Sequence, residues 1–179
     1  VFWDREEELA ALRAWRRASP RLAVLHGRRR FGKTSLLRRW LREADGCYVQ
    51  ATEGTPAAQR ASLARDLEGI LPGFGEVDYP SWRALLDALR RQWPAAAPVL
   101  VLDELPYLAQ AAPELPSLLQ ALIDAPDAQH LPLVICGSSQ RMMQGLVLDA
   151  AAPLYGRAQA MLRLEALPVG VLRKALALP

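Results

Sequence analysis

A length of 179 residues suits one domain, and 51% hydrophobic with 23% charged residues favours a folded globular core over a disordered chain. The net charge of +3 is too small to indicate a polyanionic partner, and no apolar run approaches the length of a membrane span. The start of the chain lacks the basic flank and apolar run of a signal peptide. It also lacks an initiator Met, so we expect residues 1–179 to be the excised core domain of a longer protein.

The cysteines and lysines of the chain are few, and each type carries information. Cys47 and Cys136 fall in apolar segments without a second metal ligand at the usual spacing, so we expect buried thiols, which suit a reducing cytoplasm. Lys33 and Lys174 are the only lysines, whereas arginine supplies the remaining basic charge. A lysine in this chain therefore points to a chemical requirement for it.

The hydrophobic pattern alternates between helix and strand from the start of the chain. Apolar residues at helical spacing predict a helix over residues 5–17, and a short apolar run predicts a strand over residues 22–26. Helical spacing resumes from residue 33, and residues 47–51 are predicted to form the second strand. A strand, a glycine-containing turn and a helix thus follow one another early in the sequence.

The same alternation continues to the end of the chain. Thr55 followed by Pro56 is typical of a helix start, because Thr caps the first turn and Pro fits it. Three more strands are predicted at residues 99–102, 131–137 and 160–167, and further helices at residues 82–89 and 115–123. Strands separated by helices predict an α/β three-layer sandwich with a parallel five-stranded sheet, whose ligands bind beyond the carboxyl ends of the strands.

Residues 27–34, GRRRFGKT, match the phosphate-loop pattern G-x-x-x-x-G-K-[ST]. Glycines let the backbone turn tightly and aim its N–H groups inward, and the following helix N-terminus adds partial positive charge. Lys33 is expected to reach the β- and γ-phosphates, Thr34 to ligate Mg²⁺, and Ser35 to contact the α-phosphate. Because the scarce lysine stands where the pattern requires it, nucleotide binding is favoured over a glycine turn that binds nothing.

The arginines inside this loop leave two roles open. Arg28, Arg29 and Arg30 either touch phosphate or face solvent or a partner. The residues assigned to nucleotide binding are Gly27, Arg28, Arg29, Arg30, Phe31, Gly32, Lys33, Thr34 and Ser35.

Residues 99–104, VLVLDE, combine four apolar residues with two carboxylates, as in a Walker B motif. Asp103 is expected to hold Mg²⁺ directly or through water. Glu104 is expected to orient and deprotonate the attacking water, so the pair favours hydrolysis. The alternative is a strand that ends in two solvated acids, and the upstream phosphate loop argues against it.

Two further sites follow in the sequence. Ser138 or Ser139, after the strand at 131–137, is expected to sense the γ-phosphate and orient the water, and either serine also suits a helix N-cap. Arg157 lies on a loop with Pro153 and Gly156, before the last predicted strand. Its guanidinium would stabilise transition-state charge in cis or from a neighbouring subunit, and a surface ion pair is the alternative.

These motifs, in this order, resemble the archaeal-type P-loop ATPases, a family grouped with the STAND class of the AAA+-like superfamily. The segments that carry the resemblance are FWDREEEL at residues 2–9, HGRRRFGKTSLL at 26–37, ICGSS at 135–139 and PLYGR at 153–157. Many families share the phosphate loop alone, whereas the combination is far more specific and covers nearly the whole chain.

The resemblance implies an ASCE-type sheet with strand order 5-1-4-3-2. The strand followed by Ser138 then lies between the strands that lead into the phosphate loop and into Asp103. The implied order also puts the last strand beside the first, so we expect Arg157 near the phosphate loop. The resemblance further implies that Arg157 is functional and that residues 2–5 border the adenine. Family members continue into a helical or winged-helix region and often a further C-terminal domain, so lid contacts would lie beyond residue 179.

The motifs are consistent with three functions. The first is an ATP-hydrolysing molecular switch, in which ATP and Mg²⁺ order the loops after the third and fourth strands. The second is a nucleotide-gated binding or scaffold module with negligible turnover. The third is a phosphotransferase, which the paired acids disfavour. A protein partner or a homo-oligomer suits the first two, whereas dispersed basic residues without interleaved aromatics do not support nucleic-acid binding.

Overall fold

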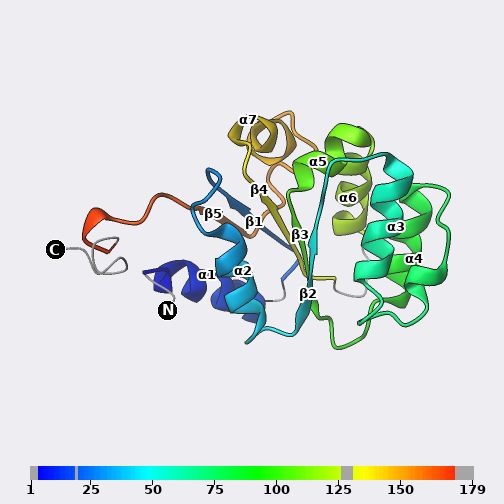
Figure 1. The fold of residues 1–179 in the computed structure, drawn as a ribbon, viewed down its shortest axis with the longest axis horizontal. Coiled ribbons are helices and arrows are strands. Elements are labelled where there is room, and N and C mark those ends of the chain that lie inside the picture. Colours follow the sequence, from blue (N-terminus) through cyan, green and yellow to red (C-terminus); the bar gives the residue numbers. More distant parts are fainter. Residues whose placement is uncertain (1–3, 19, 126–130, 172–179) are drawn as a thin grey trace.

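The computed structural model describes residues 4–18, 20–125 and 131–171, which form a three-layer α/β fold around one parallel sheet (Figure 1). The strands are β1 (Leu22–His26), β2 (Gly46–Gln50), β3 (Val99–Asp103), β4 (Leu133–Gly137) and β5 (Ala160–Arg163). Their order across the sheet is β2-β3-β4-β1-β5, and every neighbouring pair is parallel. The predicted fold class and the predicted order 5-1-4-3-2 are confirmed.

Helices cover both faces of this sheet. They are α1 (Glu6–Arg17), α2 (Lys33–Leu41), α3 (Pro56–Asp66), η1 (Phe74–Glu76), α4 (Trp82–Gln92), α5 (Leu105–Ala111), α6 (Leu115–Asp124), α7 (Gln140–Met143) and the π-helical η2 (Gln144–Leu148). Figure 1 shows α1 and α2 on one side of the sheet and α3, α4 and α6 on the other. Because both faces are covered, every residue of β1, β3 and β4 is buried.

Each face of the sheet has its own hydrophobic core. Trp15 of α1 and Trp40 of α2 pack together in the core on one face, with ring centroids 6.0 Å apart. Trp82, the first residue of α4, and Trp93, directly after it, are buried in the larger core on the opposite face. Burying side chains of this size contributes about 1.5–3 kcal/mol each or more, so the sheet that carries the site is held rigidly from both sides.

Local signals place several helix starts. The Thr55 hydroxyl accepts a hydrogen bond from the N–H of Ala58 at 3.3 Å, with Pro56 in the first turn, as predicted. The Ser81 hydroxyl caps α4 in the same way, accepting from the N–H of Ala84 at 3.1 Å. Among the described residues, no helix combines the length and the apolar character needed to cross a membrane.

The structure corrects three predicted boundaries. The fifth strand ends at Arg163 rather than at residue 167, because its neighbour β1 ends at His26 and offers nothing further to pair with. The fourth strand begins at Leu133 rather than at residue 131, because Pro132 has no N–H to donate to the sheet. The second strand covers Gly46–Gln50, one residue earlier than predicted.

Candidate functional site

The phosphate loop leaves the carboxyl end of β1 through a backbone turn that requires glycine. Gly27 has a φ of 152°, and a Cβ added there would lie 2.4 Å from the carbonyl oxygen of Leu164. Gly32 adopts the left-handed conformation (φ 86°) directly before α2 begins at Lys33. The two glycines therefore let the loop curl over the first turn of α2, whose free N–H groups suit an anion.

Lys33 reaches back into this curl. Its side chain is buried, with 6% of its surface exposed, and its Nζ donates to the carbonyl oxygens of Gly27 at 2.7 Å and Arg28 at 3.0 Å. A lysine ammonium has three N–H donors, so these contacts leave a third for an incoming anion. The ammonium thus lies inside the loop, where a phosphate chain would follow the backbone N–H groups.

Thr34 and Asp103 meet at the carboxyl end of β3. The Thr34 hydroxyl donates to Oδ2 of Asp103 at 2.9 Å, and the aspartate is 2% exposed. Donation to the carboxylate leaves the lone pairs of the hydroxyl oxygen for a cation. A hydroxyl and a carboxylate beside a phosphate site are the oxygen donors that Mg²⁺ takes, so these residues fit the ion.

Glu104 follows Asp103 in an uncommon backbone conformation. It is a non-glycine residue in the left-handed region (φ 55°, ψ 41°), and its N–H donates to Oδ1 of Asp103 at 2.9 Å. Its carboxylate accepts a hydrogen bond from the backbone N–H of Ser138 at 3.1 Å. Strained conformations of this kind cluster at functional sites, and this one turns the second carboxylate away from the first toward the end of β4.

The phosphate loop also reaches the end of β4. The Arg29 guanidinium donates to the Ser138 hydroxyl at 3.4 Å and to the hydroxyl of Tyr107 on α5. Ser139 is the helix N-cap that the sequence allowed for either serine. Its hydroxyl accepts a hydrogen bond from the N–H of Met142 at 3.4 Å and caps α7. Arg29, Ser138 and Glu104 are therefore joined through one serine.

A cavity of about 420 Å³ opens at this edge of the sheet. It is lined by Arg29, Arg30, Gly32, Lys33, Thr34, Ser35, Gln50, Glu104 and Tyr107. The volume lies within the range of small-molecule sites. Of the three arginines in the loop, two line the cavity, whereas Arg28 is exposed and outside that lining.

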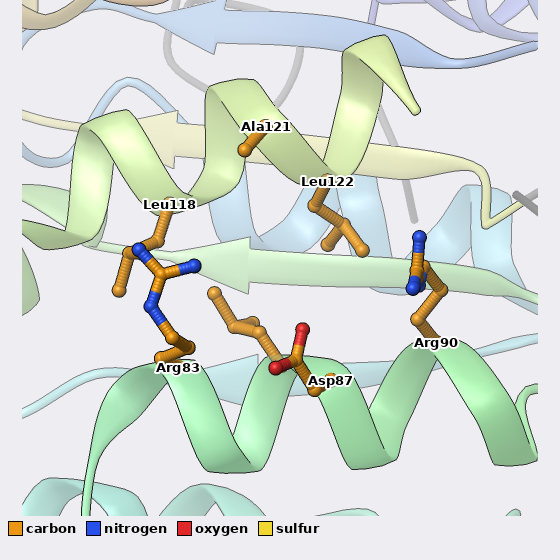
Figure 2. Close-up of a pocket in the computed structure, with 7 residues that line it drawn as sticks. Arg83, Asp87, Arg90, Leu118, Ala121 and Leu122 are labelled. Atoms are coloured by element: carbon orange, nitrogen blue, oxygen red, sulfur yellow. The ribbon is translucent and has the colours of Figure 1, made fainter. Parts of the chain in front are cut away.

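A second hollow, of about 210 Å³, lies between α4 and α6. Figure 2 shows Arg83, Asp87 and Arg90 extending from α4 toward Leu118, Ala121 and Leu122 of α6. No residue of the phosphate loop or of the Asp103–Glu104 pair lines this hollow. The larger cavity is therefore the candidate functional site.

Arg157 does not lie where we expected it. It precedes β5, whose first residue Ala160 pairs with Ala23 near the start of β1, whereas the phosphate loop follows the end of β1. The guanidinium instead donates to Asp124, at the end of α6, through Nε (2.9 and 3.0 Å) and Nη2 (2.8 Å). The length of β1, about 13 Å at ~3.3 Å per residue, separates this edge from the loop.

The expected position of Arg157 near the phosphate loop of its own chain is therefore wrong. Neighbouring parallel strands run in the same direction, so a loop that enters one strand lies opposite the loop that leaves the next. Within the described chain, the contacts of Arg157 match the alternative of an ion pair. A contribution to a neighbouring subunit stays a prediction.

Two residues that line the cavity were missed in the sequence. Tyr107 and Gln50 line the cavity without belonging to any motif. Arg5 belongs to the segment that was expected to border the adenine. It is buried and donates to the carbonyl oxygens of Phe31 at 3.1 Å and Glu165 at 2.6 Å, which ties the start of α1 to the loop and to the segment after β5. Of the other residues in that segment, Asp4 is exposed, and positions 2 and 3 lie outside the described residues.

Comparison with known proteins agrees with this geometry. Residues 2–174 match the family described as an ATPase domain predominantly from Archaea. An uncharacterized protein of Methanocaldococcus jannaschii is 32% identical over 173 residues, which are 93% of this chain and 36% of that protein. The chain thus spans about a third of the length of this curated relative.

Solved structures share the fold at low sequence identity. A Walker-type ATPase of Pyrococcus abyssi superposes with a TM-score of 0.74 at 20% identity, over 99% of this chain and 60% of its own. Cdc6p of Pyrobaculum aerophilum gives 0.67 at 24% identity, over 97% and 48%. A STAND protein with a tetratricopeptide repeat sensor from Pyrococcus horikoshii gives 0.59 at 17% identity, over 98% and 25%. At these identities the likeness concerns the fold alone.

Proposed function

This chain belongs to the family of ATPase domains found predominantly in Archaea, and on that premise we propose that it binds ATP with Mg²⁺, hydrolyses it, and acts as a molecular switch. The observation that carries the proposal is the position of the Glu104 carboxylate. It borders the cavity of the phosphate loop and follows directly after the aspartate that Thr34 contacts. A base beside a phosphate cradle and a cation site is the arrangement that hydrolysis of a phosphoanhydride needs.

Binding begins at the N-terminus of α2. The phosphates of ATP lie against the loop N–H groups, and Lys33 directs its remaining N–H to the β- and γ-phosphate oxygens. Arg29 and Arg30, which line the same cavity, add positive charge on its open side. This cluster of cations explains why a polyphosphate is favoured over a neutral ligand.

Thr34 and Asp103 would hold Mg²⁺, the first through its hydroxyl oxygen and the second through its carboxylate. When bound, Mg²⁺ neutralises charge that develops between the β- and γ-phosphates. The hydrogen bond between Thr34 and Asp103 is already formed, so little side-chain reorganisation is needed.

The hydrolytic step uses Glu104 and Ser138. Glu104 accepts a proton from a water molecule while the water oxygen bonds to the γ-phosphorus and the bond to the ADP oxygen breaks. The Ser138 N–H keeps the carboxylate in place. We assign Arg29 to the charge that grows on the γ-phosphoryl oxygens in cis, and leave Arg157 as a candidate only from a neighbouring subunit.

Release of phosphate would change the contacts of Ser138 and Arg29, and through them the loops after β3 and β4. Such a change is the basis of the proposed switch. We further propose that the whole protein continues beyond this core domain into a C-terminal region that acts with it, that it works in the cytoplasm, and that its partner is a protein or a second copy.

Phosphate release by the full-length protein in saturating MgATP tests this proposal. Steady release that disappears in the Lys33→Ala variant would support an ATPase. Tight MgATP binding without release would favour the scaffold module instead. Absence of nucleotide binding in a folded protein would refute both.

A further inference from the structure

Tyr48 is a polar member of the cation site that no sequence motif includes. It lies in β2, where it pairs in register with Val101 of β3, so the side chain of Asp103, two residues further along, projects from the same face of the sheet. The Tyr48 hydroxyl hydrogen bonds to Oδ2 of Asp103 and lies 3.4 Å from the Thr34 hydroxyl. One phenol thus contacts both oxygen donors that fit Mg²⁺.

The direction of these hydrogen bonds follows from the groups themselves. An ionised carboxylate only accepts, so the phenol donates its single proton to Asp103. Oδ2 of Asp103 then accepts from both Tyr48 and Thr34, while Oδ1 accepts from the N–H of Glu104. Both carboxylate oxygens are therefore anchored, and rotation of the carboxylate would break at least one of these bonds.

The ring of Tyr48 is itself held from α2. The guanidinium carbon of Arg38 lies 4.8 Å from the ring centroid, within the range of a cation–π contact. Arg38 is one helical turn beyond Thr34, so both side chains project from the same side of α2. Helix α2 thereby supplies the hydroxyl at the cation site and also fixes the ring that orients the carboxylate.

We propose that Tyr48 is a positioning residue of the Mg²⁺ site, which holds the Asp103 carboxylate in the orientation that the cation needs. This inference rests on the proposed function, because it assumes that Thr34 and Asp103 hold Mg²⁺ beside ATP. Without the phenol hydroxyl, the carboxylate gains freedom that must be lost when the cation binds. Loss of a residue that orients a metal ligand weakens metal affinity roughly tenfold or more.

The test is Tyr48→Phe in the full-length protein, because this change removes only the hydroxyl. Tyr79→Phe is the matched control, since the Tyr79 hydroxyl is buried in the other core and has no hydrogen-bond partner among the described residues. Binding of a nonhydrolysable ATP analogue is measured against Mg²⁺ concentration and again in EDTA, together with the melting temperature of each variant.

We expect Tyr48→Phe to raise the Mg²⁺ concentration at half-saturation roughly tenfold, with unchanged affinity for the analogue in EDTA. Tyr79→Phe should leave both quantities unchanged. An unshifted Mg²⁺ midpoint in Tyr48→Phe would overturn the inference and leave the proposed function standing. An equal loss of affinity with and without Mg²⁺ would also overturn it, by showing a general structural role. A wild-type protein whose binding ignores Mg²⁺ would overturn the proposed function as well.

Discussion

The backbone N–H of Ser138 donates to the Glu104 carboxylate at 3.1 Å, which joins the residue after β4 to the residue after β3. The two strands are neighbours in the sheet, so this contact depends on the strand order as much as on the two residues. Glu104, the proposed base, and Arg29 therefore both contact Ser138, the proposed sensor of the γ-phosphate. Changes at any of the three should therefore affect turnover more than folding.

Lys33→Ala should abolish ATP binding or weaken it strongly without unfolding the domain. The ammonium donates to two carbonyl oxygens of the loop, so its loss removes phosphate contacts and loop hydrogen bonds rather than apolar packing. Isothermal titration with ATP measures the affinity, and circular dichroism checks the fold. Lys174→Ala, at the only other lysine, controls for loss of positive charge; unchanged ATP affinity in Lys33→Ala would contradict the site.

Glu104→Gln should keep MgATP binding and lose hydrolysis. The amide oxygen can still accept from the Ser138 N–H, so the loop should stay in place, but the amide cannot take the proton of a water molecule. Asp103→Asn provides the contrast, because it should weaken the Mg²⁺-dependent part of binding. Phosphate release and MgATP affinity are measured for both. Wild-type turnover in Glu104→Gln would rule out the role of a general base.

The positions of these carboxylates illustrate which parts of the site are predictable. A run of apolar residues identified β3, and the strand pattern placed Asp103 and Glu104 at its end. The left-handed backbone of Glu104 and the seven-residue α5 that follows were not predicted. A helix of seven residues shows almost no hydrophobic periodicity in the sequence. Its first residue also depends on the left-handed backbone of Glu104, which directly precedes it.

Other contacts depend on pairing between distant strands. Tyr48 reaches Asp103 only because β2 lies beside β3 in this register, which hydrophobic alternation cannot specify. The expected position of Arg157 near the phosphate loop, by contrast, was inconsistent with the strand order that we predicted. A loop entering β5 had to lie at the edge opposite the phosphate loop once β5 was placed parallel to β1. The contact with Asp124 needed the structure.

Arg29→Ala should lower turnover at least tenfold while ATP affinity falls less. The guanidinium lines the cavity and contacts the Ser138 hydroxyl, so it lies beside the proposed base rather than inside the phosphate cradle. Arginines that meet transition-state charge contribute roughly a thousandfold in turnover. Turnover and ATP affinity are measured together, with Arg28→Ala as the neighbouring control outside the cavity lining. Equal losses in the two variants would assign the effect to net charge alone.

Arg157→Ala should lower the free energy of unfolding at neutral pH and leave ATP affinity unchanged. The hydrogen bonds from Arg157 hold the pKa of the Asp124 carboxyl below its usual range, so the pair contributes stability above the unfolded pKa of about 3.9. That contribution is lost as pH falls through the lower folded pKa, because the unfolded state then binds more protons than the folded state. The stability difference between wild type and Arg157→Ala should therefore shrink from pH 7 toward pH 3, as urea unfolding at each pH would measure. Asp124→Asn should reduce stability at neutral pH in the same direction, and a difference that stays constant with pH would contradict the ion pair.

Turnover of the full-length Arg157→Ala protein is measured in parallel. A loss of tenfold or more that is partly restored by mixing with Glu104→Gln subunits would show that the arginine also acts on a neighbouring subunit, since the two defects then lie in different chains.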